Sequence, residues 1–165
     1  MTNMTRAGTF GAALLLSVAA MAGETSGPVS VEFVNPGEFA DIKERMFPSK
    51  PEENRHLQSL RKHMEKSAAR YLSSGQTLLI KFVDIDLAGE ILPQTNPSFL
   101  DVRTVKGVYP PRAKLSYELR DAQGAAIRSG DADLRDLGFD TQAVGAGSDP
   151  LRFEKRMIDS WLRRV

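Results

Sequence analysis

The chain of 165 residues contains 22 Lys and Arg, 21 Asp and Glu, and no cysteine. The lack of cysteine excludes disulfides and a lipid attached to an N-terminal cysteine, so we expect a hydrophobic core to hold the fold. The near-zero net charge argues against nucleic acid as a partner.

The N-terminal segment, MTNMTRAGTFGAALLLSVAAMAG, follows the order of a secretory signal peptide. Arg6 precedes an apolar stretch, and the small-residue pattern AMA precedes Gly23. The apolar stretch over residues 7–20 is shorter than the roughly 20 residues that cross a bilayer. We therefore expect a signal peptide over residues 1–22 that is cleaved after Ala22, and no transmembrane span in the mature chain.

A strand and a long helix are the first elements predicted in the mature chain. The segment VSVEFV, residues 29–34, alternates apolar and polar side chains, as does a strand with one face on a core. An amphipathic helix is expected between Glu52 and Ser73, because apolar residues recur there at helical spacing: Leu57, Leu60, Met64, Ala68, Tyr71 and Leu72. Ser49 and Glu52 have the spacing of a capping box, and Gly75 follows the last turn.

The middle of the chain predicts strands. Residues 77–87 are almost continuously apolar, which favours a central strand covered on both faces. Residues 99–105 form a weaker candidate, and residues 113–120 alternate strictly between apolar and polar. A type I turn from Asp121 to Gly124 then returns the chain as a hairpin.

Two features mark the C-terminal part. Beyond Ser129 and Gly130 the apolar positions change parity, which predicts a glycine bulge in the returning strand. A last helix is expected from Asp149, its cap, with Pro150 in the first position. Its inward side comprises Leu151, Glu154, Met157, Ile158, Trp161 and Val165.

The order of these elements predicts one α+β domain over residues 23–165. The helix between the first two strands supplies a crossover connection, whereas the later links are too short for crossovers and require antiparallel pairing. We expect a single mixed, mostly antiparallel sheet with the helices packed on one face.

Asp84 and Asp86 interrupt the apolar segment VDIDLAGE and are the first candidates for chemistry. With Glu90 they resemble part of a calcium loop, but Ala88 and Thr95 occupy positions where oxygen ligands belong. A structural role is the alternative, with the acids bonded to loop amides or paired with an arginine: Arg103, Arg112 or Arg135. A carboxylate pair could also serve glycoside hydrolysis, although the only tryptophan lies on the apolar side of the last helix.

Other polar patterns favour solvated surfaces. His56 and His63 are seven residues apart on the helix, too far to share one zinc ion. No serine lies in a G-x-S-x-G setting, so the common nucleophile arrangements are missing. Basic residues line the first helix at Arg55, Lys62, Lys66 and Arg70, and the last helix at Arg152, Lys155, Arg156, Arg163 and Arg164. They could meet anionic lipid or an acidic partner, or simply face water.

Four segments together resemble a family of small exported bacterial proteins known as a domain of unknown function. They are VEFVNPGEFADI, DIDLAGE, YPPRAKLSYELRD and GAAIRSGDADLRDLGF, and they cover almost the whole mature chain. The resemblance implies a secreted single domain, and it supplies no catalytic residues.

These observations favour a non-enzymatic periplasmic domain that binds an envelope protein or a small ligand and uses no cofactor. We expect Asp84, Asp86, Arg112 and Asp136 to hold the scaffold. The alternative is a metal-dependent binder or hydrolase that uses the acidic cluster of Asp84, Asp86 and Glu90.

Overall fold

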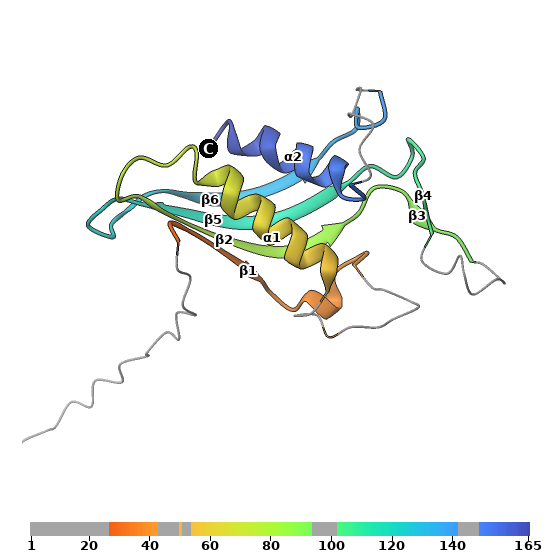
Figure 1. The fold of residues 1–165 in the computed structure, drawn as a ribbon, viewed down its shortest axis with the longest axis horizontal. Helices are drawn as coiled ribbons and strands as arrows, with labels where there is room; N and C mark the ends of the chain where they lie inside the picture. The colour runs from red at the N-terminus through yellow and green to blue at the C-terminus, as the bar shows by residue number, and fades with distance from the viewer. Residues whose placement is uncertain (1–26, 43–49, 51–53, 94–101, 142–148) are drawn as a thin grey trace, which may run out of the picture.

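The computed structural model describes residues 27–42, 50, 54–93, 102–141 and 149–165 (Figure 1). The predicted signal peptide, the capping box of Ser49 and Glu52, and Thr95 lie outside the described residues.

Four strands form one mixed sheet in the order β1-β2-β5-β6. The strands are β1 (Val29–Phe33), β2 (Thr77–Asp86), β5 (Arg112–Arg120) and β6 (Ala126–Arg135). β1 runs parallel to β2, and the other two pairings are antiparallel. The parallel pair requires a crossover, which contains α1 (Arg55–Ala68). The sheet is therefore mixed and mostly antiparallel, as the sequence predicts.

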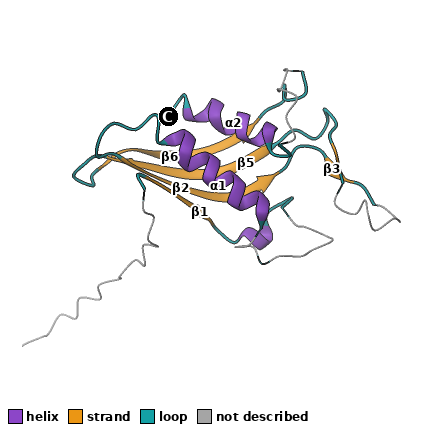
Figure 2. Cartoon of the chain, viewed as in Figure 1, coloured by secondary structure: helices purple, strands orange, loops and turns teal. Residues whose placement is uncertain are grey.

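Both helices, α1 and α2 (Arg152–Leu162), cover the same face of the sheet (Figures 1 and 2). We call this the inner face and the opposite side the outer face. Alternate strand residues, among them Ile80, Phe82 and Leu115, are buried between the sheet and the helices. Trp161 on α2 lies edge-on to Tyr117, with ring centroids 5.5 Å apart. The apolar positions of each strand thus decide which face receives the helices.

The prediction that β2 is covered on both faces is wrong. Its N-terminal half alternates, with Leu78, Ile80 and Phe82 buried, whereas Lys81 is exposed and Val83 is 51% exposed. The strand is central, but the described residues place no helix on its outer face. Its continuous apolar character reflects Leu79 and Val83, which lie on the more open side.

The limits of both helices differ from the predicted ones. α1 begins after Asn54, whose side-chain oxygen accepts hydrogen bonds from the amides of His56 and Leu57, and it ends at Ala68. Gly75 has the expected positive φ of 81° but lies in the later turn, and Tyr71 is 54% exposed. α2 starts two residues later than predicted, although Asp149 still accepts a hydrogen bond from the Leu151 amide.

The turn between β5 and β6 is confirmed, and the bulge is displaced. Asp121 accepts a hydrogen bond from the Gly124 amide at the predicted turn. The extra residue in β6 is Ile127, because Arg120 pairs with Ala126 and Leu119 pairs with Arg128. The bulge is therefore near the turn and not at Gly130, which instead lies opposite the ring of Tyr117.

Three short elements complete the described structure. A turn of 3-10 helix, η1 (Pro36–Glu38), follows β1. β3 (Glu90–Ile91) and β4 (Arg103–Thr104) form a small separate sheet. Of the predicted strand over residues 99–105, the structure describes residues 102–105, and β4 is the part of these that is strand. Among the described residues, no helix is both long and apolar enough to cross a bilayer.

Candidate functional site

A bulge in β2 decides which way the two aspartates point. Upstream of it, Phe82 faces the core opposite Leu115, and strict alternation would send Asp84 into the core too. The pairing instead shifts at Val83, so that Asp84 lies opposite Lys114 and Ile85 takes the buried position. The extra residue thereby moves both acids to the outer face and avoids the cost of burying two charges.

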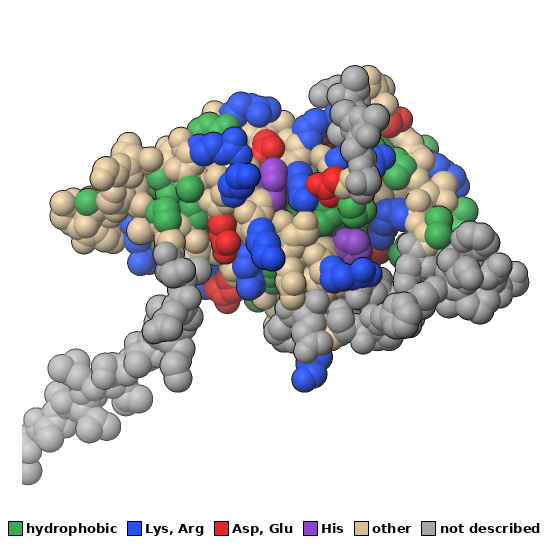
Figure 3. All heavy atoms as spheres, viewed as in Figure 1, with side chains coloured by type: hydrophobic (Ala, Val, Ile, Leu, Met, Phe, Trp, Pro, Cys, Tyr) green, Lys and Arg blue, Asp and Glu red, His purple; other side chains and the backbone are tan. Residues whose placement is uncertain are grey.

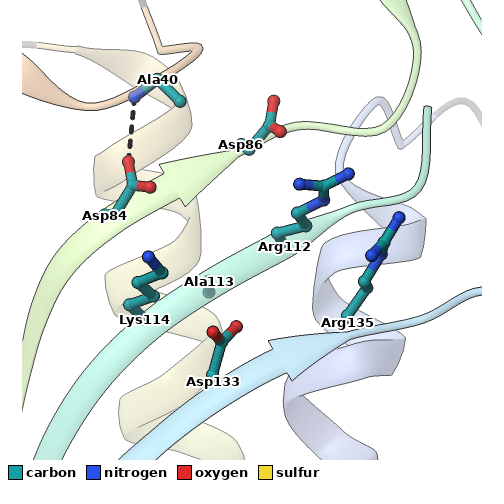
Figure 4. Close-up of a pocket in the computed structure, with 8 residues that line it drawn as sticks. All are labelled: Ala40, Asp84, Asp86, Arg112, Ala113, Lys114, Asp133 and Arg135. Atoms are coloured by element: carbon teal, nitrogen blue, oxygen red, sulfur yellow. Dashed lines mark hydrogen bonds between the residues drawn. The ribbon is translucent and has the colours of Figure 1, made fainter.

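Asp84 and Asp86 border a hollow of about 480 Å³ on this outer face (Figure 4). Its charged lining comes from three neighbouring strands, in two rows that cross the sheet. One row contains Asp84, Lys114 and Asp133, and the other contains Asp86, Arg112 and Arg135. Ala40 and Ala113 complete the lining. The hollow thus brings three acids and three bases together.

Asp84 is tied to the backbone. Its Oδ1 atom accepts a hydrogen bond of 2.9 Å from the amide of Ala40, in the segment that follows β1 (Figure 4). This contact joins residues 44 positions apart along the chain. A loop amide is one of the partners that the sequence suggests for this acid, and the contact fits a role in holding the scaffold.

Asp86 lies in a less favourable environment. Its main chain forms an isolated bridge with Asp41, so the two carboxyl groups are neighbours. Partial burial and the Asp41 charge raise the pKa of Asp86 above its ordinary value of 3.8, although Arg112 opposes this shift. Asp41 is itself paired with Arg103. Asp86 thus lies near Asp41, and the arginine that could offset both charges, Arg103, is already paired with Asp41.

The residues that follow Asp86 form hydrogen bonds with three other parts of the chain. The Ala88 amide donates a 2.7 Å hydrogen bond to Glu154 on α2. Gly89 donates from its amide to the carbonyl of Tyr109 and accepts from Arg103. Gly89 has a φ of 80°, and a Cβ atom there would lie 2.4 Å from the carbonyl oxygen of Thr104. Glycine is therefore required by conformation and by space.

Glu154 is a buried acid with one oxygen unpaired. The residue is 2% exposed, and its Oε2 atom has no hydrogen-bond partner among the residues that the structure describes. Burial raises the pKa of Glu154 above its ordinary value of 4.5, and the Ala88 amide opposes this shift only in part. The sequence places Glu154 on the inward side of the last helix without giving it a role; its partner could not be read from local spacing.

Glu90 does not join the two aspartates. It lies on β3, accepts a 2.8 Å hydrogen bond from the Lys106 ammonium, and does not line the hollow. The Lys106 contact lowers the pKa of Glu90. Within the described ranges, no group of three or more His, Cys, Asp and Glu side chains is arranged to hold a metal ion. The predicted acidic cluster therefore separates into a pair and a single residue.

Asp136 lies outside the hollow, at the end of β6. Its carboxylate pairs with Arg156 at 2.9 Å and accepts a hydrogen bond from the Gly138 amide. Arg156 also donates to the carbonyl of Phe139. These contacts connect the end of the sheet to α2. Arg112, in contrast, lines the hollow between Asp86 and Arg135.

Lys114 and Asp133 line the hollow but were not predicted as site residues, and Arg135 was predicted only as a partner for the acids. The strict alternation of residues 113–120 is the signal that could have placed Lys114 on the outer face, since its neighbours Ala113 and Leu115 are buried. The position of Asp133 can be predicted only from the register between β5 and β6, and the displaced bulge changes that register.

The helix-covered side carries many of the remaining cations (Figure 3). Exposed members on α1, directly after it and near the C-terminus are Arg55, Lys62, Lys66, Arg70, Arg163 and Arg164. His63 contacts Asp159 of α2 at 2.8 Å. Lys155 pairs with Asp149 at 2.7 Å. Part of the predicted basic surface is thus engaged in contacts within and between the helical segments.

The fold and the hollow define a small α+β domain with helices on one face of a mixed sheet and a charged depression on the other. The chain belongs to the family described as "Protein of unknown function (DUF3016)", whose model matches residues 27–164. Comparison with curated proteins and with solved structures finds no match. The family match confirms the resemblance noted from the sequence, and it brings no activity with it.

Proposed function

We propose that this protein is an exported periplasmic binding domain without catalytic activity, which engages another envelope component through the outer face of its sheet. The observation that carries the proposal is the charged hollow. Arg112, Lys114, Asp133 and Arg135 form no salt bridge with any described residue, and the helices lie on the opposite face. Charged groups without internal partners are available to a ligand at no cost of breaking a contact.

A scaffold role for the acids of VDIDLAGE supports binding over catalysis. Asp84 bonds to a backbone amide, and Glu90 bonds to Lys106. Burial and the charges of Asp41 and Asp84 raise the pKa of Asp86, and Arg112 opposes this shift. The contacts of Asp84 and Glu90 fit acids that hold segments together.

Export is supported by the N-terminal sequence alone. The order of one basic residue, an apolar stretch and small residues predicts cleavage between Ala22 and Gly23. The intact mass of the protein from a periplasmic fraction should correspond to a chain that starts at Gly23. A membrane-bound product that retains residues 1–22 would contradict the export proposal.

Site-specific crosslinking tests the binding surface. A photoreactive residue replaces Asp131, which is exposed on the outer face opposite Ser116, and in a matched variant it replaces Lys62, which is exposed on α1. We expect a discrete crosslinked product in the envelope fraction from position 131 and none from position 62. The product should weaken when Lys114→Glu is added. Equal crosslinking from both faces, or crosslinking only from α1, would contradict the proposed surface.

A further inference from the structure

Within the four strands of the main sheet, charged residues that are paired on the outer side have opposite signs, with one exception. Lys81 pairs with Glu32 at 2.9 Å, and Lys114 lies between Asp84 and Asp133. The exception lies in the hollow, where Arg112 is directly opposite Arg135. Like charges at opposed positions of an antiparallel pair destabilise it, so this pair costs stability in the isolated protein.

Neither guanidinium is held by a direct contact with a described acid, although the Asp86 charge acts on Arg112 from the neighbouring strand. In the described part of the chain, neither guanidinium forms a salt bridge or a hydrogen bond, and the two residues are paired through their main chains. Figure 4 shows both guanidinium groups on the same side of the sheet, directed along the strands toward the same end of the hollow. The two planar guanidinium groups, on adjacent strands, therefore direct several N–H donors into the hollow.

We propose that Arg112 and Arg135 together bind a carboxylate of the ligand in this hollow. The inference rests on the proposed function, because it uses the same open face, and it adds the chemical class of the group that is recognised. A guanidinium matches a carboxylate through two parallel hydrogen bonds. A doubly charged phosphate is disfavoured, since Asp84, Asp86 and Asp133 border the same space.

The test compares two N-acetylated dipeptides that differ only at the C-terminus. N-acetyl-Ala-Ala has a free carboxylate, and N-acetyl-Ala-Ala amide has none. Binding is measured by calorimetry for the parent protein, for Arg135→Gln and for Lys81→Gln. Lys81→Gln is the matched control, because it removes a cation from the same face where that cation has a partner.

We expect the parent and Lys81→Gln to bind the acid and not the amide at millimolar concentrations. Arg135→Gln should weaken binding of the acid roughly tenfold or more, since a charge-assisted contact is lost. Its melting temperature without ligand should equal or exceed that of the parent, because the repulsion of Arg112 is relieved. A residue that only stabilised the fold would show the opposite shift.

Three results would overturn the carboxylate site: equal binding of the acid and the amide, including no binding of either; unchanged binding in Arg135→Gln; or tighter binding of inorganic phosphate than of the acid. The crosslinking from position 131 separates this inference from the proposed function. If that product persists in the parent while the carboxylate probe fails, the outer face binds a partner by other contacts, and only the inference is wrong.

Discussion

The segment from Asp84 to Glu90 and the arginine pair beside it lie at the same end of the sheet and are built in opposite ways. In the segment, Asp84, Ala88 and Gly89 each have a partner far away in the chain. Arg112 and Arg135 have none within the described residues and face each other across two strands. The difference fits a role of Asp84 in holding the fold, whereas the side chains of the two arginines remain available to a ligand.

The largest effect is expected at the centre of the fastened segment. Gly89→Ala should lower the free energy of unfolding by about 1 to 3 kcal/mol through its positive φ alone, and the collision with Thr104 should add to this loss. Gly124→Ala is the control, since its φ is 85° but nothing lies within 4 Å of the added Cβ. Denaturant midpoints should therefore fall further for Gly89→Ala. Equal losses would show that the contact of Gly89 with β4 is unimportant.

Glu154→Gln should alter the dependence of stability on pH. Because burial raises the folded-state pKa of Glu154 above 4.5, ionisation favours the unfolded chain, and each unit of the shift corresponds to about 1.4 kcal/mol. The contribution of neutral Glu154 to stability is fully present below the pKa of Glu154 in the unfolded chain, and it is lost as the pH rises through its pKa in the folded protein. The variant should match the parent near pH 4, where both side chains are neutral, and exceed its stability at neutral pH.

The stability of Glu154→Gln must be compared with that of the parent at each pH, because the pKa values of other acids shift in the opposite direction. Contacts with Lys155 and the Leu151 amide lower the pKa of Asp149, although burial opposes them. Subtracting the parent from the variant removes such common terms. Chemical denaturation at several pH values would show the divergence, and parallel stability curves would mean that Glu154 does not titrate differently in the folded state.

Asp84→Ala should lower the free energy of unfolding by about 0.5 to 1.5 kcal/mol, the usual net value of one hydrogen bond. The loss arises because the Ala40 amide loses its acceptor. Asp84→Asn keeps an acceptor oxygen and should recover most of it. If Asp84→Ala is as stable as the parent and loses the crosslinked product from position 131, then Asp84 belongs to the binding surface and not to the scaffold.

The smallest effect is expected for Asp86→Asn. Its raised pKa shows that the folded protein disfavours the Asp86 charge, so removing that charge should leave stability at neutral pH unchanged or slightly higher. Substitution of Asp84 and of Asp86, two residues apart in β2, should thus change stability in opposite directions, and a melting curve of each variant decides this. A clear loss of stability in Asp86→Asn would mean that its attraction to Arg112 outweighs burial and the Asp41 charge.

Most of the fold could be predicted from the sequence, but only part of the candidate site. The alternation in residues 113–120 places Ala113 and Leu115 in the core, and the helical spacing of Leu57, Leu60 and Met64 gives the buried side of α1. Asp86 and Arg112 were recognised as site candidates. Glu90 was grouped with them by proximity in sequence, although the start of β3 directs it to Lys106.

What the sequence determined by itself is the set of properties that repeat over a few residues: strand and helix periodicity, the turn after β5 and the mixed sheet that follows from link lengths. The tertiary structure alone decided the properties that depend on register between distant segments. The bulge at Val83 turned Asp84 outward, and the bulge at Ile127 set which residue of β6 faces Arg112. One extra residue reverses every later side chain of a strand, and the cost of burying charge selects where it is inserted.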